Sequence, residues 1–326
     1  MKKVLSLVLT VLLVAALMLT AGCAKEPEYE AADISVACMT GPTGVGMAKL
    51  MADSDAKSTA NNYTFTVAGD ATGINEKFVK GEINIASVPT NVAATLYNKT
   101  NGKVRILAVN TYGVLSILAK DSSIDSIEDL KGKTIYSTGK GQNPEFIFKY
   151  ILEKNGINPE TDLTINFVSS TDLVAKLVSG EAEVALAPEP AATTVLVKNK
   201  ELNRVLSIND EWSKVSDTTL MMGCVIALDS YVAENGAAVE KFLEEYKASI
   251  EFAKTDVDTA AKHCETYKIT ASEAIAKKAI PTCNLCYVTG KDMKTNVNGY
   301  LNVLFNADKK AVGGAMPADD FYYKAD

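Results

Sequence analysis

The chain has 326 residues, a formal net charge of −7, and 47% hydrophobic residues. This length is enough for two domains of about 100–200 residues each. Arginine occurs only at positions 105 and 204, and no basic run is interleaved with aromatic residues. The composition therefore argues against a nucleic-acid-binding protein.

The chain begins with the pattern of a secretory signal. Lys2 and Lys3 precede an apolar stretch over residues 4–19, which is short for a membrane span. Small residues lead into Cys23, as in a bacterial lipobox, with Leu19 one place further out than usual. The resemblance implies cleavage before Cys23 and a lipid on its sulfur, which would anchor the chain to the membrane. A plain secreted protein or an uncleaved anchor remains the alternative.

This interpretation divides the beginning of the chain into a signal peptide over residues 1–22 and a tether over 23–32. Removing Lys2 and Lys3 moves the formal charge from −7 to −9. The sequence beyond the signal contains no further apolar run of membrane-spanning length.

Beyond residue 33, apolar strands alternate with amphipathic helices. Strands are predicted over residues 34–39, 63–68, 83–86, 104–109, 114–119, 134–136, 163–168, 184–186, 205–207 and 221–228. Helices are predicted over residues 47–53, 74–80, 90–97, 145–154, 172–178, 191–199, 239–254, 259–267, 272–278 and 291–306, and everything beyond residue 228 is predicted to be helical. The alternation indicates an α/β protein with mainly parallel, buried sheets.

One segment of the chain occurs twice. Residues 81–89, GEINIASVP, recur ninety-nine positions later as residues 180–188, GEAEVALAP. Each copy has the pattern of a helix, a glycine stop, a short strand and a proline-started helix. The repeat predicts two similar lobes that face each other across a cleft, where small molecules commonly bind. Chance similarity between common α/β units is the alternative.

The cysteines indicate buried thiols more than a metal or redox site. Cys283 and Cys286 form a lone C-x-x-C motif, and the only histidine, His263, precedes Cys264. A zinc site needs a second pair or spaced histidines, and a redox motif would start a helix, whereas this one follows Pro281 in a predicted loop. A disulfide such as Cys264–Cys283 stays open. We expect no metal and no cofactor.

Four loops at the carboxyl ends of predicted strands are candidates for ligand binding, since ligands of α/β sheets bind there. They offer backbone N–H groups at helix starts, hydroxyl and amide groups, and the carboxylate of Glu189. With Tyr112 as a flat wall, the candidate residues are Thr40, Gly41, Thr43, Gly44, Ser87, Thr90, Asn91, Tyr112, Thr138, Gly139, Lys140, Gln142, Asn143 and Glu189. Tight turns, and for Glu189 a charge that stabilises a helix start, are the alternatives.

Taken in order, the lipobox, the Thr-Gly-x-x-Gly helix opening at residue 40, the two repeat copies and the segment DLKGK at 129–133 resemble an ABC-transporter substrate-binding lipoprotein. The most similar group is that of nitrate, taurine, sulfonate and thiamine-pyrimidine-precursor binding proteins, with a type II periplasmic-binding-protein fold. The resemblance implies a first lobe of residues 33–113 and 223–326, a second lobe of 114–222, and a two-strand hinge. It also implies an ABC permease with its ATPase as partners, and a monomer held at the outer face of the cell membrane.

The expected ligand is a small polar or zwitterionic molecule, because the cleft loops carry no arginine and Lys140 is their only cation. The two arginines are predicted to lie away from the cleft mouth, and Glu189 is expected to face Asn91 across it and to meet a ligand amine. A binding lobe for a membrane signalling partner is one alternative, and an enzyme of the pyrimidine-synthase-like branch is another. We expect no catalytic residues, since no Ser-His-Asp spacing or acid–base pair is present.

Overall fold

The computed structural model describes residues 29–120 and 122–324. The predicted signal peptide and Cys23 lie outside the described residues, and so does most of the predicted tether. Within the described ranges, no helix combines the length and the apolar character that a membrane crossing requires.

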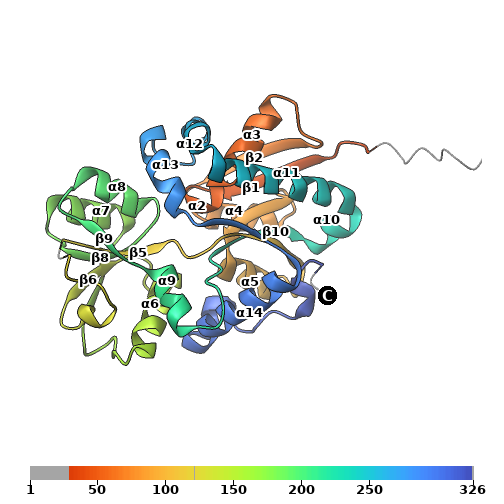
Figure 1. Ribbon diagram of the computed structural model, residues 1–326. Coiled ribbons are helices and arrows are strands. Elements are labelled where there is room, and N and C mark those ends of the chain that lie inside the picture. Colours follow the sequence, from red (N-terminus) through yellow and green to blue (C-terminus); the bar gives the residue numbers. More distant parts are fainter. Residues whose placement is uncertain (1–28, 121, 325–326) are drawn as a thin grey trace, which may run out of the picture. The chain divides into compact units, whose positions relative to one another are not determined.

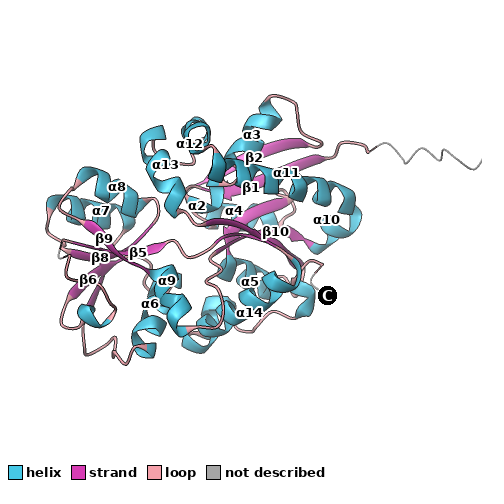
Figure 2. Cartoon of the chain, viewed as in Figure 1, coloured by secondary structure: helices cyan, strands magenta, loops and turns pink. Residues whose placement is uncertain are grey.

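Two sheets, each covered by helices, organise residues 32–324 (Figures 1 and 2). Sheet A has six strands in the order β11–β4–β10–β3–β1–β2. Its strands are β1 (Asp33–Met39), β2 (Asn62–Ala68), β3 (Ile85–Pro89), β4 (Val104–Thr111), β10 (Gly223–Leu228) and β11 (Leu285–Val288). Strand β1 is parallel to β2 and β3, whereas β10 is antiparallel to β3 and β4, and β11 to β4.

Sheet B has five strands in the order β7–β6–β8–β5–β9. Its strands are β5 (Leu115–Ala119), β6 (Thr134–Ser137), β7 (Thr164–Phe167), β8 (Val184–Pro188) and β9 (Asn203–Ser207). Strand β6 is parallel to β7 and β8, and β5 is antiparallel to β8 and β9. We call sheet A with its helices lobe 1, and sheet B with its helices lobe 2.

Helices connect most of these strands. The helices before β5 are α2 (Pro42–Val45), α3 (Ala48–Asp55), α4 (Thr72–Val79) and α5 (Thr90–Lys99). Those between β5 and β10 are η1 (Glu128–Leu130), α6 (Asn143–Lys154), α7 (Ser170–Ser179), α8 (Ala191–Lys198) and α9 (Ile208–Val215). Those after β10 are α10 (Asp229–Glu234), α11 (Gly236–Thr255), α12 (Val257–Thr266), α13 (Glu273–Ala279), η2 (Ile280–Thr282), α14 (Gly290–Ala307), η3 (Lys309–Val312) and η4 (Asp319–Phe321).

The repeated segment builds the same unit in both lobes. In lobe 1 it is α4–β3–α5, and in lobe 2 it is α7–β8–α8. Strand β3 lies between parallel β1 and antiparallel β10, and β8 lies between parallel β6 and antiparallel β5. Gly81 and Gly180 end their helices with φ of 77° and 80°, where glycine is favoured. The predicted match in topology between residues 74–97 and 173–196 is therefore confirmed.

The α/β class and the two lobes are confirmed, but the sheets are mixed. In each sheet the strand through which the chain enters the lobe is antiparallel to both of its neighbours, namely β5 in sheet B and β10 in sheet A. The hydrophobic periodicity of a sequence cannot give the direction of a strand. That direction depends on how the chain crosses from one lobe to the other.

The chain beyond residue 228 is not all helical, since Leu285–Val288 forms the edge strand β11. Its four residues pair only with β4, so the segment is too short for a clear periodic signal. No individual helix was predicted over the ranges of α2, α9 or α10. All three are short, with 4, 8 and 6 residues.

Cysteines 38, 224, 264, 283 and 286 are all free and buried, so the Cys264–Cys283 disulfide that the sequence left open does not form in this structure. Burial raises the pKa of the Cys264 thiol to about 12. The prediction of buried thiols is confirmed.

The chain passes between the sheets twice, from β4 to β5 and from α9 to β10. The two passages are bonded to each other, since the Met222 N–H donates to the Thr111 carbonyl at 3.0 Å. Helix α14 contacts both α5 and α6, and α13 contacts α8, so the lobes also touch beside the passages. The single tryptophan, Trp212 on α9, packs between Tyr150 of α6 and Tyr300 of α14.

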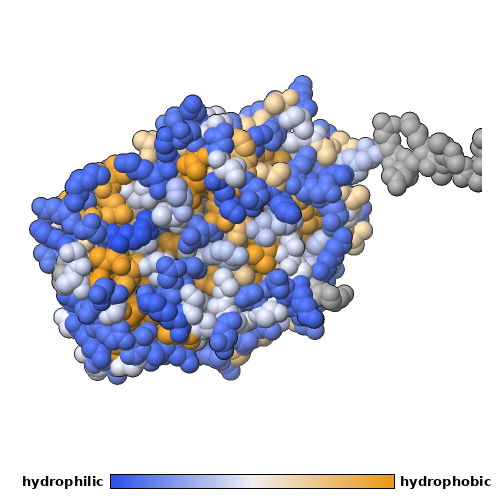
Figure 3. All heavy atoms as spheres, in the orientation of Figure 1, coloured by the Kyte–Doolittle hydropathy of each residue, from blue (hydrophilic) through white to orange (hydrophobic). Residues whose placement is uncertain are grey.

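The face seen in Figure 3 is mostly hydrophilic, with apolar residues recessed between charged and polar ones. Among the described residues, Val79 is the one large hydrophobic side chain that is exposed. A single exposed valine makes no apolar docking patch. A recessed cavity is therefore the better place for a functional site.

Candidate functional site: a pocket between the lobes

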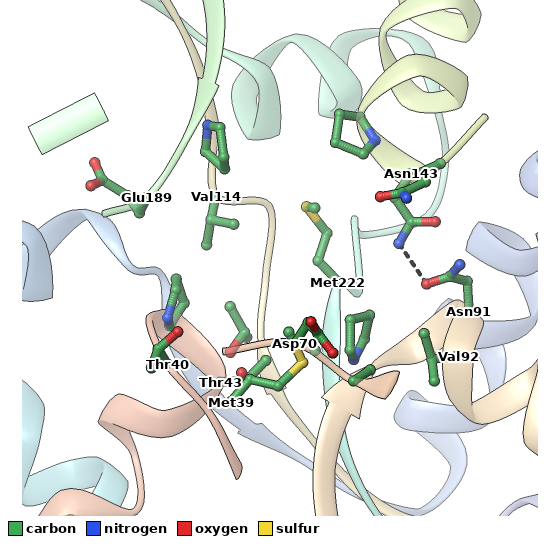
Figure 4. Close-up of a pocket in the computed structure, with 18 of the residues that line it drawn as sticks. Met39, Thr40, Thr43, Asp70, Asn91, Val92, Val114, Asn143, Glu189 and Met222 are labelled. Atoms are coloured by element: carbon green, nitrogen blue, oxygen red, sulfur yellow. Dashed lines mark hydrogen bonds between the residues drawn. The ribbon is translucent and has the colours of Figure 1, made fainter. Parts of the chain in front are cut away.

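A cavity of about 560 Å³ lies between the two lobes, within the range of small-molecule sites (Figure 4). Met39, Pro89, Thr111 and Pro188 end strands β1, β3, β4 and β8, and all four line it. The carboxyl ends of strands from both sheets therefore meet at this pocket, as expected for ligand sites of α/β folds.

Six residues that the sequence predicted for binding line the pocket. They are Thr40, Thr43, Asn91, Gln142, Asn143 and Glu189. Sequence reasoning missed several others, the most informative being Met39, Asp70, Asn75, Val92, Val114 and Met222. Asp70 follows β2 in the same way as Thr40 follows β1, so the strand-end rule could have found it. Met222 could not be found this way, because it precedes its strand.

A buried polar network fixes the first cleft loop. The Ser87 hydroxyl donates to the Thr43 carbonyl at 2.8 Å, and the Asn110 amide donates to Ser87 Oγ at 2.7 Å. Asn110 Nδ2 also donates to the Tyr246 hydroxyl of α11 at 2.8 Å. Ser87 therefore supports the loop from below and does not line the pocket.

Two glycines allow the chain segments to approach each other at this end of the pocket. A Cβ on Gly44 would lie 2.2 Å from the Met39 carbonyl oxygen. A Cβ on Gly223 would lie 2.7 Å from Asn110 Oδ1 and 2.9 Å from Thr43 Cγ2. Gly223 lines the pocket at the start of β10, so a side chain there would push the passage away from the Thr43 loop.

Asn91 faces Asn143, and not Glu189 as the sequence had suggested. Asn143 Nδ2 donates to Asn91 Oδ1 at 2.9 Å, which joins the first turn of α5 in lobe 1 to the first turn of α6 in lobe 2 (Figure 4). Asn91 Nδ2 in turn donates to the Ala311 carbonyl at 3.3 Å. This hydrogen bond closes one side of the pocket.

Glu189 is bound by the protein itself. Its side chain is 0% exposed and forms an ion pair with Arg204 Nη2. Oε1 accepts a bond from the Thr282 hydroxyl at 2.8 Å, and Oε2 accepts one from the Thr193 N–H at 3.3 Å. In Figure 4 its carboxylate points away from Asn91 and Asn143.

Arg204 itself does not line the pocket, but its guanidinium reaches Glu189, which does. Arg204 is on β9, which pairs with β5, which pairs with β8, the strand that ends just before Glu189. Its long side chain reaches across β5 and also donates to the Ser116 hydroxyl. The contact arises because β9 and β8 both flank β5 in the sheet. This order of strands cannot be read from the local sequence.

Eight predicted binding residues lie outside the pocket lining. They are Gly41, Gly44, Ser87, Thr90, Tyr112, Thr138, Gly139 and Lys140. Thr90 is fully buried, and Tyr112 lies against Cys286, where burial and that thiol raise the pKa of its hydroxyl. Lys140 lines a different cavity with Glu145 and Lys149. Gly41 and Gly139 adopt φ of 85° and 77° and shape their turns.

The described lining residues include two charged side chains, Asp70 and Glu189, and no lysine, arginine or histidine. The Glu189 charge is compensated by Arg204. The Asp70 carboxylate accepts the Thr72 N–H at 2.8 Å at the start of α4. Among the residues that the structure describes, no group of three or more His, Cys, Asp or Glu side chains is placed to hold a metal ion.

Residues 56–230, more than half of the chain, match a family model described as "ABC transporter, phosphonate, periplasmic substrate-binding protein". The chain belongs to this family. Members are substrate-binding proteins of transport systems and not enzymes, and they act outside the cytoplasm.

Part of the chain is also similar to a known binding protein. YtlA of Bacillus subtilis (strain 168) is 28% identical over 177 residues, which cover 48% of this chain and 51% of YtlA. The chain thus spans about half the length of this relative.

Two solved structures share the fold. An ABC transporter from Parabacteroides distasonis has a TM-score of 0.74 at 20% identity, covering 90% of this chain and 99% of that one. The periplasmic aliphatic sulphonate binding protein SsuA from Escherichia coli has a TM-score of 0.72 at 14% identity, covering 90% and 92%.

Proposed function

We propose that this family member is an extracytoplasmic lipoprotein that captures a small polar or zwitterionic molecule between its lobes and delivers it to an ABC permease with its ATPase. The observation that carries the proposal is the pocket of about 560 Å³ lined by strand ends of both sheets. Because both lobes contribute, a ligand there would favour a closed arrangement of the lobes. Hinge closure around a ligand is a common device of periplasmic binding proteins.

A zwitterionic ligand is supported by the two kinds of polar group in the lining. Asn91 and Val92 belong to the first turn of α5, where backbone N–H groups favour a carbonyl or carboxylate. Asp70 offers a negative charge for the other end of the ligand. Of the fourteen residues predicted from the sequence, this proposal keeps Thr40, Thr43, Asn91, Gln142 and Asn143 as ligand-binding residues. It adds Asp70 and Asn75, which also line the pocket.

We further propose lobe boundaries at residues 33–113 with 223–326, and at 114–222, a monomeric state, and anchoring through a lipid on Cys23 after removal of residues 1–22. The support for the anchor is the sequence Leu19-Thr20-Ala21-Gly22-Cys23 behind an apolar segment.

The capture step is tested by a thermal-shift screen of small polar metabolites on residues 24–326. A true ligand raises the free energy of unfolding by RT ln(1 + [L]/Kd), so the melting temperature rises with ligand concentration. Binding should also reduce the radius of gyration in solution scattering. A ligand that binds without compaction would contradict capture by closure.

The anchor is tested by replacing Cys23 with serine. The wild-type protein should partition into the detergent phase, whereas Cys23→Ser should accumulate as an uncleaved precursor. Equal cleavage of both chains would refute the lipoprotein assignment, and it would leave the cleft proposal intact.

A further inference from the structure

We infer that the bound molecule presents an N–H donor, as an ammonium or amino group, beside an apolar portion. This inference rests on the proposed function, because it takes the pocket between the lobes as the ligand site. It deepens that proposal by assigning the chemical class of the ligand from the acceptor groups of the lining.

The first acceptor is the amide oxygen of Asn143. The residue is 7% exposed, lines the pocket, and its Oδ1 has no hydrogen-bond partner. The orientation of this amide follows from its neighbours. The Ala311 carbonyl can only accept a hydrogen bond, so Asn91 must donate its Nδ2 to it, and Asn91 Oδ1 then faces Asn143. Asn143 must therefore donate its own Nδ2 to Asn91 Oδ1. Asn143 Oδ1 remains free to accept a hydrogen bond from another donor.

The second acceptor is Asn75 on α4, in lobe 1. Its Oδ1 is buried and also lacks a hydrogen-bond partner, and the residue lines the pocket. A buried amide oxygen without a partner costs free energy, so two of them around one cavity favour a ligand that supplies donors.

The charge of the lining selects the same kind of ligand. With Glu189 compensated by Arg204, Asp70 is the remaining charged group among the described lining residues. For an anion, the described lining offers no Arg or Lys donor, only hydroxyl and amide groups and the backbone N–H groups at the start of α5. An ammonium or amino group would in addition satisfy the carboxylate and the two unpartnered amide oxygens.

Apolar side chains form the rest of the surface that the ligand meets. Met39, Val92, Val114 and Met222 all line the pocket (Figure 4). Met39 and Met222 can adapt their shape to a flat or a flexible body. The ligand is therefore expected to combine a donor group with an apolar portion.

The class is tested by equilibrium dialysis of residues 24–326 against an equimolar mixture of primary amines, amino-substituted heterocycles, carboxamides, alkylphosphonates and alkylsulfonates. Compounds enriched on the protein side are identified by mass spectrometry. We expect a primary amine or an amino-substituted heterocycle to be enriched. Enrichment of a phosphonate or sulfonate instead would overturn this inference and keep the proposed function. Enrichment of none of the five classes would count against this inference alone, because the mixture contains no zwitterion and the thermal-shift screen tests the proposed function.

Two variants then test the acceptor groups with the enriched amine. Asp70→Asn keeps an oxygen for the Thr72 N–H and removes only the charge, so affinity should fall roughly tenfold. Asp256→Asn is the matched control, since Asp256 accepts the Thr259 N–H at the start of α12 outside the pocket lining, and its affinity should equal that of the wild type. An Asp70→Asn affinity equal to that of the control would contradict the assignment of Asp70.

Asn75→Leu removes the second acceptor while keeping a similar volume. Because Asn75 Oδ1 has no partner within the protein, the melting temperature should be unchanged or raised while the affinity for the amine falls roughly tenfold. An unchanged affinity in both Asn75→Leu and Asp70→Asn would refute the role of the acceptor groups.

Discussion

At the scale of single residues, the pocket separates side chains that hold the protein together from those left for a ligand. Glu189 and Asn143 both line it, and both were predicted to bind. Every oxygen of Glu189 is engaged by Arg204, Thr282 or Thr193, whereas the Asn143 oxygen is unpartnered. Hydrogen bonding within the protein, and not the residue type, therefore distinguishes the structural side chain from the one available to a ligand.

Glu189→Gln should therefore lower stability, with little effect on ligand affinity. The change leaves the Arg204 guanidinium, 24% exposed, without its charged partner. A hydrogen bond to a charged group contributes about 1.5–3 kcal/mol, and partial exposure of Arg204 places the expected loss near 1–2 kcal/mol. Glu183→Gln, an exposed acid just before β8, is the control and should be neutral. Urea unfolding and calorimetry measure the two effects, and a wild-type stability with reduced affinity would restore the ligand role.

At the scale of elements, the helix starts and strand ends around the pocket depend on close backbone contacts. The Thr43 loop, the start of β10 and the end of β4 meet at Gly223. The start of α6 is held by Glu145, whose Oε2 accepts the Gly141 N–H at 2.6 Å while Lys149 pairs with Oε1 at 2.8 Å.

Gly223→Ala should destabilise the protein by about 1–3 kcal/mol, because the new methyl would be overpacked between Asn110, Thr111 and Thr43. Gly73→Ala is the control on α4, since a methyl group there would meet no atom within 4 Å and the residue has no positive φ. It should raise stability by up to about 1 kcal/mol, because alanine favours a helix over glycine. Thermal unfolding compares the two, and equal shifts would contradict steric crowding at Gly223.

Glu145 should make the start of α6 sensitive to acid. Burial tends to raise the pKa of this carboxyl, but the Gly141 N–H and Lys149 outweigh it and hold the pKa below its ordinary value of 4.5. Its stabilisation is therefore complete above pH 4.5 and is lost as the pH falls through the lower folded-state value. Glu145→Gln should cost about 1 kcal/mol at neutral pH and little at strongly acid pH, as measured by urea unfolding across that range.

Glu76→Gln is the control for this prediction. Glu76 forms the same i,i+4 pair with Lys80 on α4, but with side chains 73% and 57% exposed. Exposed pairs contribute about 0.3–0.5 kcal/mol, so its effect should be small at every pH. A pH-independent loss in Glu145→Gln would mean that its packing, and not its charge, stabilises the helix start.

At the scale of the whole molecule, polar contacts and helix contacts among the described residues join the lobes around the pocket. Asn143–Asn91 lies on one side and Thr282–Glu189 on the other, and the Thr219 N–H donates to Asn296 Oδ1 just before β10. The helix contacts are α14 with α6 and α13 with α8. The described arrangement thus has direct contacts between the lobes on both sides of the pocket.

Thr282→Val should shift the free protein toward a more open arrangement, because it removes a cross-lobe hydrogen bond and keeps the shape of the side chain. One neutral donor to a carboxylate contributes about 1.5 kcal/mol, which corresponds to roughly a tenfold change in the ratio of open to closed molecules. Solution scattering without ligand should give a larger radius of gyration, and dissociation of a bound amine should be faster. Thr282→Ser keeps the hydroxyl and should resemble the wild type. Identical scattering of all three proteins would show that this bond does not hold the lobes.

The sequence by itself determined the α/β class, the repeated unit and the use of strand-end loops. These features are local, since periodicity, a glycine stop and a proline start act within a few residues, and the repeat needs only a comparison of the chain with itself. The bounds of β1 and α5 accordingly differ from their predictions by few residues.

Only the tertiary structure decided which groups of the pocket are free to bind. Arg204 reaches Glu189 because β9, β5 and β8 are neighbours, and Asn143 meets Asn91 because the lobes face each other. Both contacts join residues distant in sequence, so no local pattern contains them. The same cause explains the mixed sheets and the edge strand β11, since strand order and direction depend on how the chain returns to lobe 1.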